Sequence, residues 1–254
     1  MRKYVLTLAI ACLVLITSCS SSNGDGAGAA PSESAPPVAT EEAITDNSAP
    51  SDAFANLPQL NGEATVMLRV NGESIVIQVD GVHAPVTAGN FVDLVQRGVY
   101  DNTVFHRVVR EPEPFVVQGG DPQSRDPNAN PATFGTGSFV DPQSGQARYI
   151  PLEIQPSNAN EPLYSRTFPE AGVTAEPTLT HRRGAVAMAR SQFADSASAQ
   201  FYFTLADVNF LDGSYAVFGY VTEGMEVVDQ IQQGDRIESA EIIAGAENLT
   251  VAAE

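Results

Sequence analysis

The sequence has no tryptophan and only two cysteines among its 254 residues. Both cysteines, Cys12 and Cys19, lie near the start of the chain, so the rest of the chain has none for an internal disulfide. We therefore expect the folded domain to be held together by its apolar core, even in an oxidising compartment. The three histidines, with no cysteine beside them, match no usual spacing of metal ligands, and we predict neither a metal nor a cofactor.

Basic residues are also scarce. Lysine and arginine number 13 against 31 aspartate and glutamate residues, which gives a formal net charge of −18. Nucleic-acid binding needs a basic surface that displaces counterions, and attachment to anionic lipid needs a polybasic segment, so both are excluded. The one local basic cluster, His181-Arg182-Arg183, is interpreted as a solvated loop, with a contact to acidic partners as the alternative.

The longest hydrophobic run is residues 4–16, and it follows two basic residues. It is shorter than the roughly 20 residues of a membrane-spanning helix and ends in small residues, as a secretory signal does. Its end, Ile16-Thr17-Ser18-Cys19, resembles the bacterial lipobox, in which the cysteine receives a diacylglycerol. We predict a lipoprotein signal in residues 1–19 with lipidation at Cys19. An ordinary secreted protein cleaved near Ser18 and an uncleaved membrane helix are the alternatives.

Composition divides the rest of the chain into a linker, a domain and a tail. Residues 20–58 are rich in serine, alanine, proline, glycine and acidic residues, and they bury too little apolar surface to offset their ordering entropy. We predict that they form a disordered acidic linker, with Phe54, Leu57 and Leu60 docking where the chain enters the domain. Residues 59–246 have the length of one domain, and residues 247–254 are predicted to be a C-terminal tail.

Short alternating runs dominate the predicted domain. Asn71-Gly72 between two such runs predicts a hairpin, and Pro85 and Gly98 bound a run with helical spacing. Residues 122–181 are predicted to be mostly loops. Many strands with two helices favour a mainly β protein, an antiparallel closed barrel capped at its ends. The predicted strands are residues 64–70, 74–79, 105–109, 115–121, 150–154, 185–189, 201–204, 216–221 and 237–243, and the predicted helices are residues 85–97 and 225–233.

The predicted hairpin of residues 105–121 carries polar groups that a purely structural hairpin does not need. Alternation places Phe105 and Arg107 on one face of the first strand and His106 on the other. The register decides whether Gln118 of the second strand lies beside Arg107. A guanidinium stays charged and is rarely buried in a core, so we predict that Arg107 faces a groove and binds a ligand.

Three blocks of the sequence resemble the signatures of one family. Phe105-His106-Arg107 leading to Gln118-Gly119-Gly120-Asp121 is similar to the first signature, residues 200–204 with 210–219 are similar to the second, and residues 184–189 resemble the peptide-edge strand. From about residue 64 to 243, the chain thereby resembles the cyclophilin-type peptidyl-prolyl cis-trans isomerases. The resemblance implies a closed eight-stranded antiparallel β-barrel capped by two α-helices, with the active site on its outer face.

The reaction of that family gives Arg107 a role. Rotation of an X-Pro amide passes through a twisted state, against a barrier of about 18–20 kcal/mol, in which the prolyl nitrogen becomes basic. An N–H donor aimed at that nitrogen stabilises the twisted state more than the planar one, and only such differential stabilisation speeds the step. We predict that Arg107 is this catalytic donor, by its chemistry and by its match to the family's catalytic arginine. Gln118 is predicted to bond the substrate backbone and to orient Arg107.

The resemblance also implies a substrate groove beside Arg107. An apolar pocket there would hold the proline ring and exclude water, with ordinary barrel core as the alternative role of its aromatic residues. Ala189 is expected to offer main-chain groups to an extended peptide, and Gly135 belongs to a glycine loop near the groove. No nucleophile motif accompanies His106, so we predict a supporting role rather than a general base. The predicted substrate-binding residues are His106, Phe115, Val116, Gly135, Ala189, Arg190, Gln200, Tyr202, Phe210, Leu211 and Tyr215.

Some positions depart from the commonest family pattern. Phe210 stands where many members have tryptophan, Tyr215 where many have histidine, and Tyr202 where phenylalanine is usual. Because of these differences, we do not predict whether the protein binds cyclosporin. The predicted isomerase activity is unaffected by them. The turn before Phe115 and the loop of residues 122–181 are enlarged, and both border the predicted groove.

We therefore predict a peptidyl-prolyl cis-trans isomerase, lipid-anchored on the periplasmic side of a bacterial membrane, that accelerates X-Pro isomerisation in exported proteins. Its expected partners are proline-containing peptides and unfolded exported proteins, and we expect a monomer. One alternative is a cyclophilin-like peptide-binding module or chaperone with little turnover, which the altered loops and Tyr202 favour. Another is a solute-binding lipoprotein, which requires two large α/β lobes that the strand pattern does not indicate.

Overall fold

The structure, a computed structural model, describes residues 54–251. The predicted signal of residues 1–19, the predicted lipidation site Cys19 and most of the predicted linker lie outside the described residues. Within residues 54–251, no helix combines the length and the hydropathy that crossing a membrane requires.

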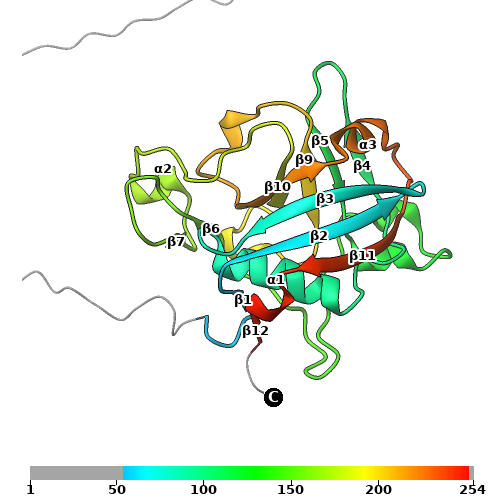
Figure 1. Ribbon diagram of the computed structural model, residues 1–254, viewed down its shortest axis with the longest axis horizontal. Coiled ribbons are helices and arrows are strands. Elements are labelled where there is room, and N and C mark those ends of the chain that lie inside the picture. Colours follow the sequence, from blue (N-terminus) through cyan, green and yellow to red (C-terminus); the bar gives the residue numbers. More distant parts are fainter. Residues whose placement is uncertain (1–53, 252–254) are drawn as a thin grey trace, which may run out of the picture. The chain divides into compact units, whose positions relative to one another are not determined.

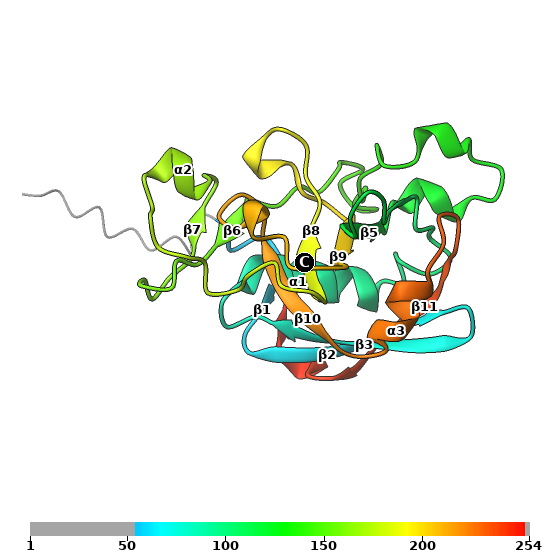
Figure 2. The same ribbon diagram turned by 90° about the horizontal axis from the view of Figure 1, so that it is seen from above.

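Eight antiparallel strands form one curled sheet, in the order β11-β2-β3-β10-β8-β9-β5-β4 (Figures 1 and 2). The predicted hairpin joins β2 and β3, and its turn residues Asn71 and Gly72 both have positive φ, as a two-residue hairpin requires. These eight strands begin and end within two residues of their predicted bounds. They are β2 (Glu63–Val70), β3 (Glu73–Asp80), β4 (Arg107–Val109), β5 (Val116–Gly119), β8 (Ala185–Met188), β9 (Phe201–Thr204), β10 (Val217–Glu223) and β11 (Ile237–Ala244).

The sheet does not close into the predicted barrel. β11 and β4 are its edge strands, and no ladder joins them within the described residues. The segments just before these two edges contact each other at an isolated antiparallel bridge between Val104 and Arg236, where main-chain hydrogen bonds join residues 102–105 to residues 234–237. β4 has three residues, and the ladder described for it is the one with β5. The fold is therefore a mainly β, open half-barrel.

Two pairs of two-residue strands lie outside the main sheet. β1 (Gln59–Leu60) pairs with β12 (Leu249–Thr250), so the prediction that residues 247–254 form a tail is wrong for β12. Leu249 packs against the main core next to the fully buried Leu60, and this burial orders the segment. The other pair is β6 (Glu153–Ile154) with β7 (Leu163–Tyr164). The predicted docking of Phe54 and Leu57 on the core is confirmed.

The predicted first helix is α1 (Pro85–Gln96), and its start is capped from a distant part of the chain. No side chain of the N-cap residue bonds the helix; instead, the carboxylate of Glu153 accepts hydrogen bonds from Val86 N at 3.1 Å and Thr87 N at 2.7 Å. The Tyr164 hydroxyl also donates to Glu153, at 2.8 Å. Burial raises the pKa of Glu153. This carboxylate therefore ties β6 to α1.

Two shorter helices complete the described fold. The predicted second helix is α3 (Met225–Gln230), which ends earlier than expected. α2 (Phe168–Ala171) was not predicted; it begins with a capping box in which Thr167 and Glu170 bond each other's main-chain N–H groups. α2, β6 and β7 belong to residues 122–181 and lie beyond one end of the main sheet (Figure 2). They enclose a small apolar cluster that includes Phe168.

Alternation along the strands divides the apolar side chains between the two faces of the sheet. Val117 of β5 and Phe203 of β9 are register partners within the main core, which also contains Phe91 of α1. Tyr202 and Val116, one position along each strand, belong instead to a second and smaller apolar cluster. Because side chains on adjacent residues of a strand point to opposite faces, this second cluster lies on the face away from the main core.

Candidate active site

Arg107 and Gln118 stand directly opposite each other on β4 and β5. Opposite residues of an antiparallel pair share a face, so the register left open by the sequence places both side chains on the face away from the core residue Val117. Phe105 was expected to share the face of Arg107, and this is wrong. β4 begins only at Arg107, so the alternation of faces along this strand does not extend back to Phe105. Phe105 is fully buried, and the centre of its ring lies 6.2 Å from the centre of the Phe203 ring.

The guanidinium of Arg107 lies at the surface and makes two contacts. Its Nη1 donates to Gln118 Oε1 over 3.5 Å, and its Cζ lies 5.5 Å from the centre of the Phe115 ring, within the range of a cation–π interaction. No carboxylate of the described residues forms an ion pair with it. Arg107 therefore has donors left for a ligand bound beside Phe115.

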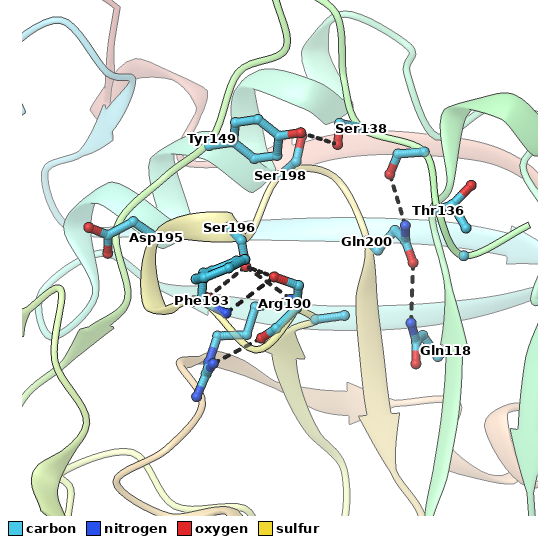
Figure 3. A pocket seen from close by; sticks show the side chains of 14 residues that line it. Gln118, Thr136, Ser138, Tyr149, Arg190, Phe193, Asp195, Ser196, Ser198 and Gln200 are labelled. Atoms are coloured by element: carbon cyan, nitrogen blue, oxygen red, sulfur yellow. Dashed lines mark hydrogen bonds between the residues drawn. The ribbon is translucent and has the colours of Figure 1, made fainter. Parts of the chain in front are cut away.

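Gln118 is held by a chain of hydrogen bonds. Its Nε2 donates to Gln200 Oε1 over 3.2 Å, and Gln200 Nε2 donates to the main-chain oxygen of Gly137 over 2.9 Å (Figure 3). Because Nε2 of Gln118 is engaged by Gln200, its Oε1 is left to face Arg107. The chain from Gly137 to Gln118 thus has the geometry to orient the guanidinium of Arg107.

An apolar patch adjoins Arg107 on the outer face. The rings of Phe115 and Phe210 stack with centres 5.7 Å apart and planes 23° apart, and Phe210 is 74% exposed. Tyr202 and Val116 are buried beneath the surface of the same region. Phe210 is thus not part of the core of the protein, and its ring is available to a ligand. We call Phe115, Val116, Tyr202, Phe210 and Leu211 the apolar patch.

Arg190 and Ala189 are already engaged within the protein. Arg190 donates to the main-chain oxygen of Ser214 from Nε and Nη2, at 3.1 and 2.8 Å, and its Cζ lies 4.6 Å from the centre of the Tyr215 ring. The N–H of Ala189 donates to Gln200 O over 2.9 Å, so of the main-chain groups that we expect Ala189 to offer to a peptide, its C=O is the one that remains a prediction. Both residues thus hold the site together through the bonds they already make.

A cavity of about 560 Å³ opens beside Gln118 (Figure 3). Its lining includes the exposed aromatic side chains of Tyr149 and Phe193, which sequence analysis missed because they lie in loops without a pattern. Apolar-patch residues are not among those that line this cavity, so most of the predicted substrate-binding residues form two groups, one in the apolar patch and one at the cavity; Tyr215 and His106 belong to neither and contact Arg190 and Gly135. The predicted residues that line the cavity are Gln118, Gly135, Ala189, Arg190 and Gln200.

Asp121 supports the glycine loop at the wall of this cavity. It is fully buried, and its Oδ2 accepts hydrogen bonds from Gly135 N at 2.6 Å and Gly137 N at 3.1 Å. Gly135 has a φ of 92°, and a Cβ at this position would lie 3.2 Å from the His106 ring. Burial is the main cause that lowers the pKa of His106, so its ring is neutral near pH 7. His106 therefore presents an uncharged ring next to Gly135.

The cluster His181-Arg182-Arg183 is not the predicted solvated loop. Arg182 and Arg183 are exposed, but the side chain of His181 is only 1% exposed. Its ring nitrogens lie within hydrogen-bond distance of Asp212 and Tyr202. These partners are 31 and 21 residues away in the chain, so no local pattern could indicate the burial of His181.

Comparisons with known proteins point to one class. The model of the family described as cyclophilin type peptidyl-prolyl cis-trans isomerase matches residues 65–247. A protein named as a thylakoid lumen peptidyl-prolyl cis-trans isomerase of Synechocystis sp. is 43% identical, over 78% of this chain and 52% of its own length. The chloroplastic peptidyl-prolyl cis-trans isomerase CYP38 of Arabidopsis thaliana is 38% identical, over 78% of this chain and 46% of its own length.

A solved structure of a cyclophilin type peptidyl-prolyl cis-trans isomerase from Cryptosporidium parvum matches with a TM-score of 0.53 at 22% identity. The match covers 72% of this chain and 98% of that one, and it shows the fold. The curled sheet is thus that of the cyclophilins, and this chain belongs to the cyclophilin-type peptidyl-prolyl cis-trans isomerase family. The chain spans about half the length of the two curated relatives named above.

Proposed function

We propose that this protein is a peptidyl-prolyl cis-trans isomerase. The observation that carries the proposal is the pairing of Arg107 with Gln118 next to the apolar patch. This places a permanently charged group with several fixed N–H donors beside aromatic rings that a proline ring can contact. Membership of the family supports the same activity.

Catalysis by this arrangement depends on what changes as the amide twists. In the planar amide, the nitrogen lone pair is delocalised and accepts a hydrogen bond poorly. As the bond rotates, the lone pair localises, and a donor from Arg107 then stabilises the twisted state more than either planar state. No covalent bond is made or broken, so the chemistry needs neither a nucleophile nor a proton transfer.

The two groups of residues around Gln118 would bind different parts of the peptide. The proline ring would lie on Phe115 and Phe210, where apolar contact also removes the water that favours the more polar planar amide. The cavity beside Gln118 offers space for a neighbouring residue of an extended peptide. The weak bond between Arg107 and Gln118 can be exchanged for bonds to the substrate when the peptide binds.

Exchange NMR on a short alanine-proline peptide tests this function. We expect that adding the protein produces exchange cross-peaks between the cis and trans signals, which are absent for the peptide alone because uncatalysed isomerisation takes tens to hundreds of seconds. A protein that shifts the peptide signals without any exchange is a binding module with the cyclophilin fold, and this result would overturn the proposed catalysis.

We further propose that the protein acts on exported proteins outside the cytoplasm, anchored by lipid at Cys19. The signal-like residues 1–19 support this proposal, as do the names of two relatives, one of the thylakoid lumen and one chloroplastic. The test is to express the full chain in a bacterium supplied with radiolabelled palmitate. We expect label in the membrane fraction for the wild type and none for Cys19→Ser; equal labelling of both would contradict the anchor.

A further inference from the structure

His181 is a buried histidine that connects two parts of the apolar patch. Its Nδ1 lies 2.7 Å from Asp212 Oδ1, and its Nε2 lies 3.0 Å from the hydroxyl oxygen of Tyr202. A carboxylate oxygen accepts hydrogen bonds, so Nδ1 carries the proton and donates to Asp212. Nε2 is then the acceptor, and the Tyr202 hydroxyl donates to it.

The ring of His181 is held in its neutral form. Burial lowers its pKa, and this effect exceeds the opposing effect of the Asp212 carboxylate. Burial also raises the pKa of the Tyr202 phenol. Among the nearby groups, Tyr215 and Asp212 raise this pKa further and Arg190 lowers it. Near neutral pH, the three side chains therefore form one directed series of hydrogen bonds from Tyr202 through His181 to Asp212.

The main chain of His181 is tied to the same loop as its side chain. His181 N donates to Asp212 Oδ1 over 2.8 Å, and Val208 N donates to His181 O over 2.8 Å. Between these two attachment points lies the 3₁₀ turn Asn209–Leu211, which carries two residues of the apolar patch. The loop of residues 208–212 is thus fastened to His181 at both of its ends.

This attachment matters for Phe210, the most exposed residue of the apolar patch. Its ring is 74% exposed and stacks on Phe115, so its position depends on where the main chain of the loop is fixed. Tyr202, the other partner of His181, lies in the buried part of the same patch.

We propose that His181 is a positioning residue for the peptide-binding surface, which fixes the ring of Tyr202 and the loop of residues 208–212 relative to each other. This inference rests on the proposed function, because it assigns the apolar patch to the proline of the substrate. His181 does not touch the substrate; it acts through Tyr202 and Phe210. Loss of its ring leaves both main-chain bonds of His181 in place but removes the bonds of the ring to Asp212 and Tyr202. We expect this to weaken binding of the planar and twisted states alike, which raises KM and leaves kcat nearly unchanged.

Kinetics of three variants test the proposal. We expect His181→Ala to raise KM for a proline peptide about tenfold, with kcat within about threefold of the wild type. Tyr202→Phe keeps the ring and removes only the hydroxyl, and in the His181→Ala background we expect it to add almost no further effect, because the two residues act as one unit. The matched control is Arg182→Ala, since Arg182 is the adjacent residue and its guanidinium stacks on Tyr220 at 4.0 Å instead; its KM should equal that of the wild type.

A spectroscopic test does not require the alanine variant to fold. In ¹⁵N NMR of the wild type, we expect His181 as the Nδ1–H tautomer, and Tyr202→Phe should raise its pKa because a hydrogen bond to the neutral form is lost. An Nε2–H tautomer, or a folded His181→Ala variant with wild-type KM, would overturn the inference. If the wild type does not catalyse isomerisation at all, the proposed function fails, and the Kd of the same peptide then replaces KM: an unchanged Kd in His181→Ala rejects the positioning role.

Discussion

Arg107 Nη1 and Gln118 Oε1 are 3.5 Å apart, at the outer limit of a hydrogen bond, across the paired strands β4 and β5. A bond of this length orients the guanidinium without consuming much of its donor capacity. The bonds behind Gln118 are shorter, at 3.2 Å to Gln200 and 2.9 Å from Gln200 to Gly137. Gln118 is therefore held in place by Gln200, whereas the guanidinium of Arg107 can adjust its position when a substrate binds.

Gln200 is expected to affect catalysis without contacting the prolyl nitrogen. Gln200→Ala removes the acceptor of Gln118 Nε2, so the Gln118 amide can turn and present Nε2 to Arg107 in place of Oε1. We expect kcat/KM to fall about tenfold, the size of one hydrogen bond. Steady-state kinetics of the peptide assay measure this, with Gln233→Ala as an exposed control. An unchanged kcat/KM would mean that Arg107 needs no orientation by this chain.

Phe115 is expected to supply apolar contact to the proline ring and to hold Arg107 by its ring face. Phe115→Ala removes both the stack on Phe210 and the cation–π contact. Loss of about 2 kcal/mol of apolar contact corresponds to a fall in kcat/KM of about 30-fold. Phe115→Leu, which keeps apolar bulk but no ring, should lie between the two. A Phe115→Ala variant with wild-type kcat/KM would remove the apolar patch from the site.

Stability should decrease as the pH falls below 6.5, the ordinary pKa of histidine. Burial lowers the pKa of both His181 and His106, against the opposing effects of Asp212 and Asp121, so between the lowered value and 6.5 the unfolded chain binds more protons than the folded one. The free energy of unfolding then falls with falling pH. Urea denaturation on both sides of pH 6.5 measures this.

The variant His181→Asn isolates the contribution of His181 to this pH dependence. Its free energy of unfolding should fall less steeply with falling pH than that of the wild type. The comparison of the two proteins cancels the contribution of Glu153, whose pKa burial raises and which therefore acts in the opposite sense. Identical slopes would show that His181 is as easily protonated in the folded protein as in the unfolded chain.

Glu153 is expected to be a large contributor to stability among the charged residues. Glu153→Ala leaves the N–H groups of Val86 and Thr87 and the hydroxyl of Tyr164 without their acceptor. Leaving such buried groups unpaired costs about 3 kcal/mol, which urea denaturation should register as a lower midpoint with an unchanged slope. Glu161→Ala, on an exposed side chain, should change the midpoint little. A wild-type midpoint for Glu153→Ala would mean that water replaces the carboxylate at the start of α1.

Local patterns in the sequence predicted several elements of the fold, including the strands that carry Arg107 and Gln118. The Asn71-Gly72 turn, the Pro85 start of α1 and the strands around Arg107 and Gln118 are each specified by neighbours in the chain, and all are present. The register that pairs Arg107 with Gln118 required the structure, because the long turn between them does not determine it.

Features that depend on distant residues could not be predicted. The strands that end up at the open edges, β4 and β11, come from distant parts of the chain, and so do the paired strands β1 and β12. The burial of His181 depends on partners from two other segments. The cavity beside Gln118 is lined in part by loop residues such as Tyr149, whose placement no periodicity indicates.

The central claim is that a hydrogen bond from Arg107 stabilises the twisted amide. Exchange NMR on one proline peptide, with the wild type, Arg107→Ala and Arg107→Lys at equal peptide saturation, tests it most directly. We predict that Arg107→Ala slows the bound-state exchange about 10²–10³-fold, as removal of a transition-state donor does elsewhere, while the peptide still binds. Arg107→Lys should recover little, because a single ammonium lacks the planar fork. Exchange at the wild-type rate in Arg107→Ala would contradict the account.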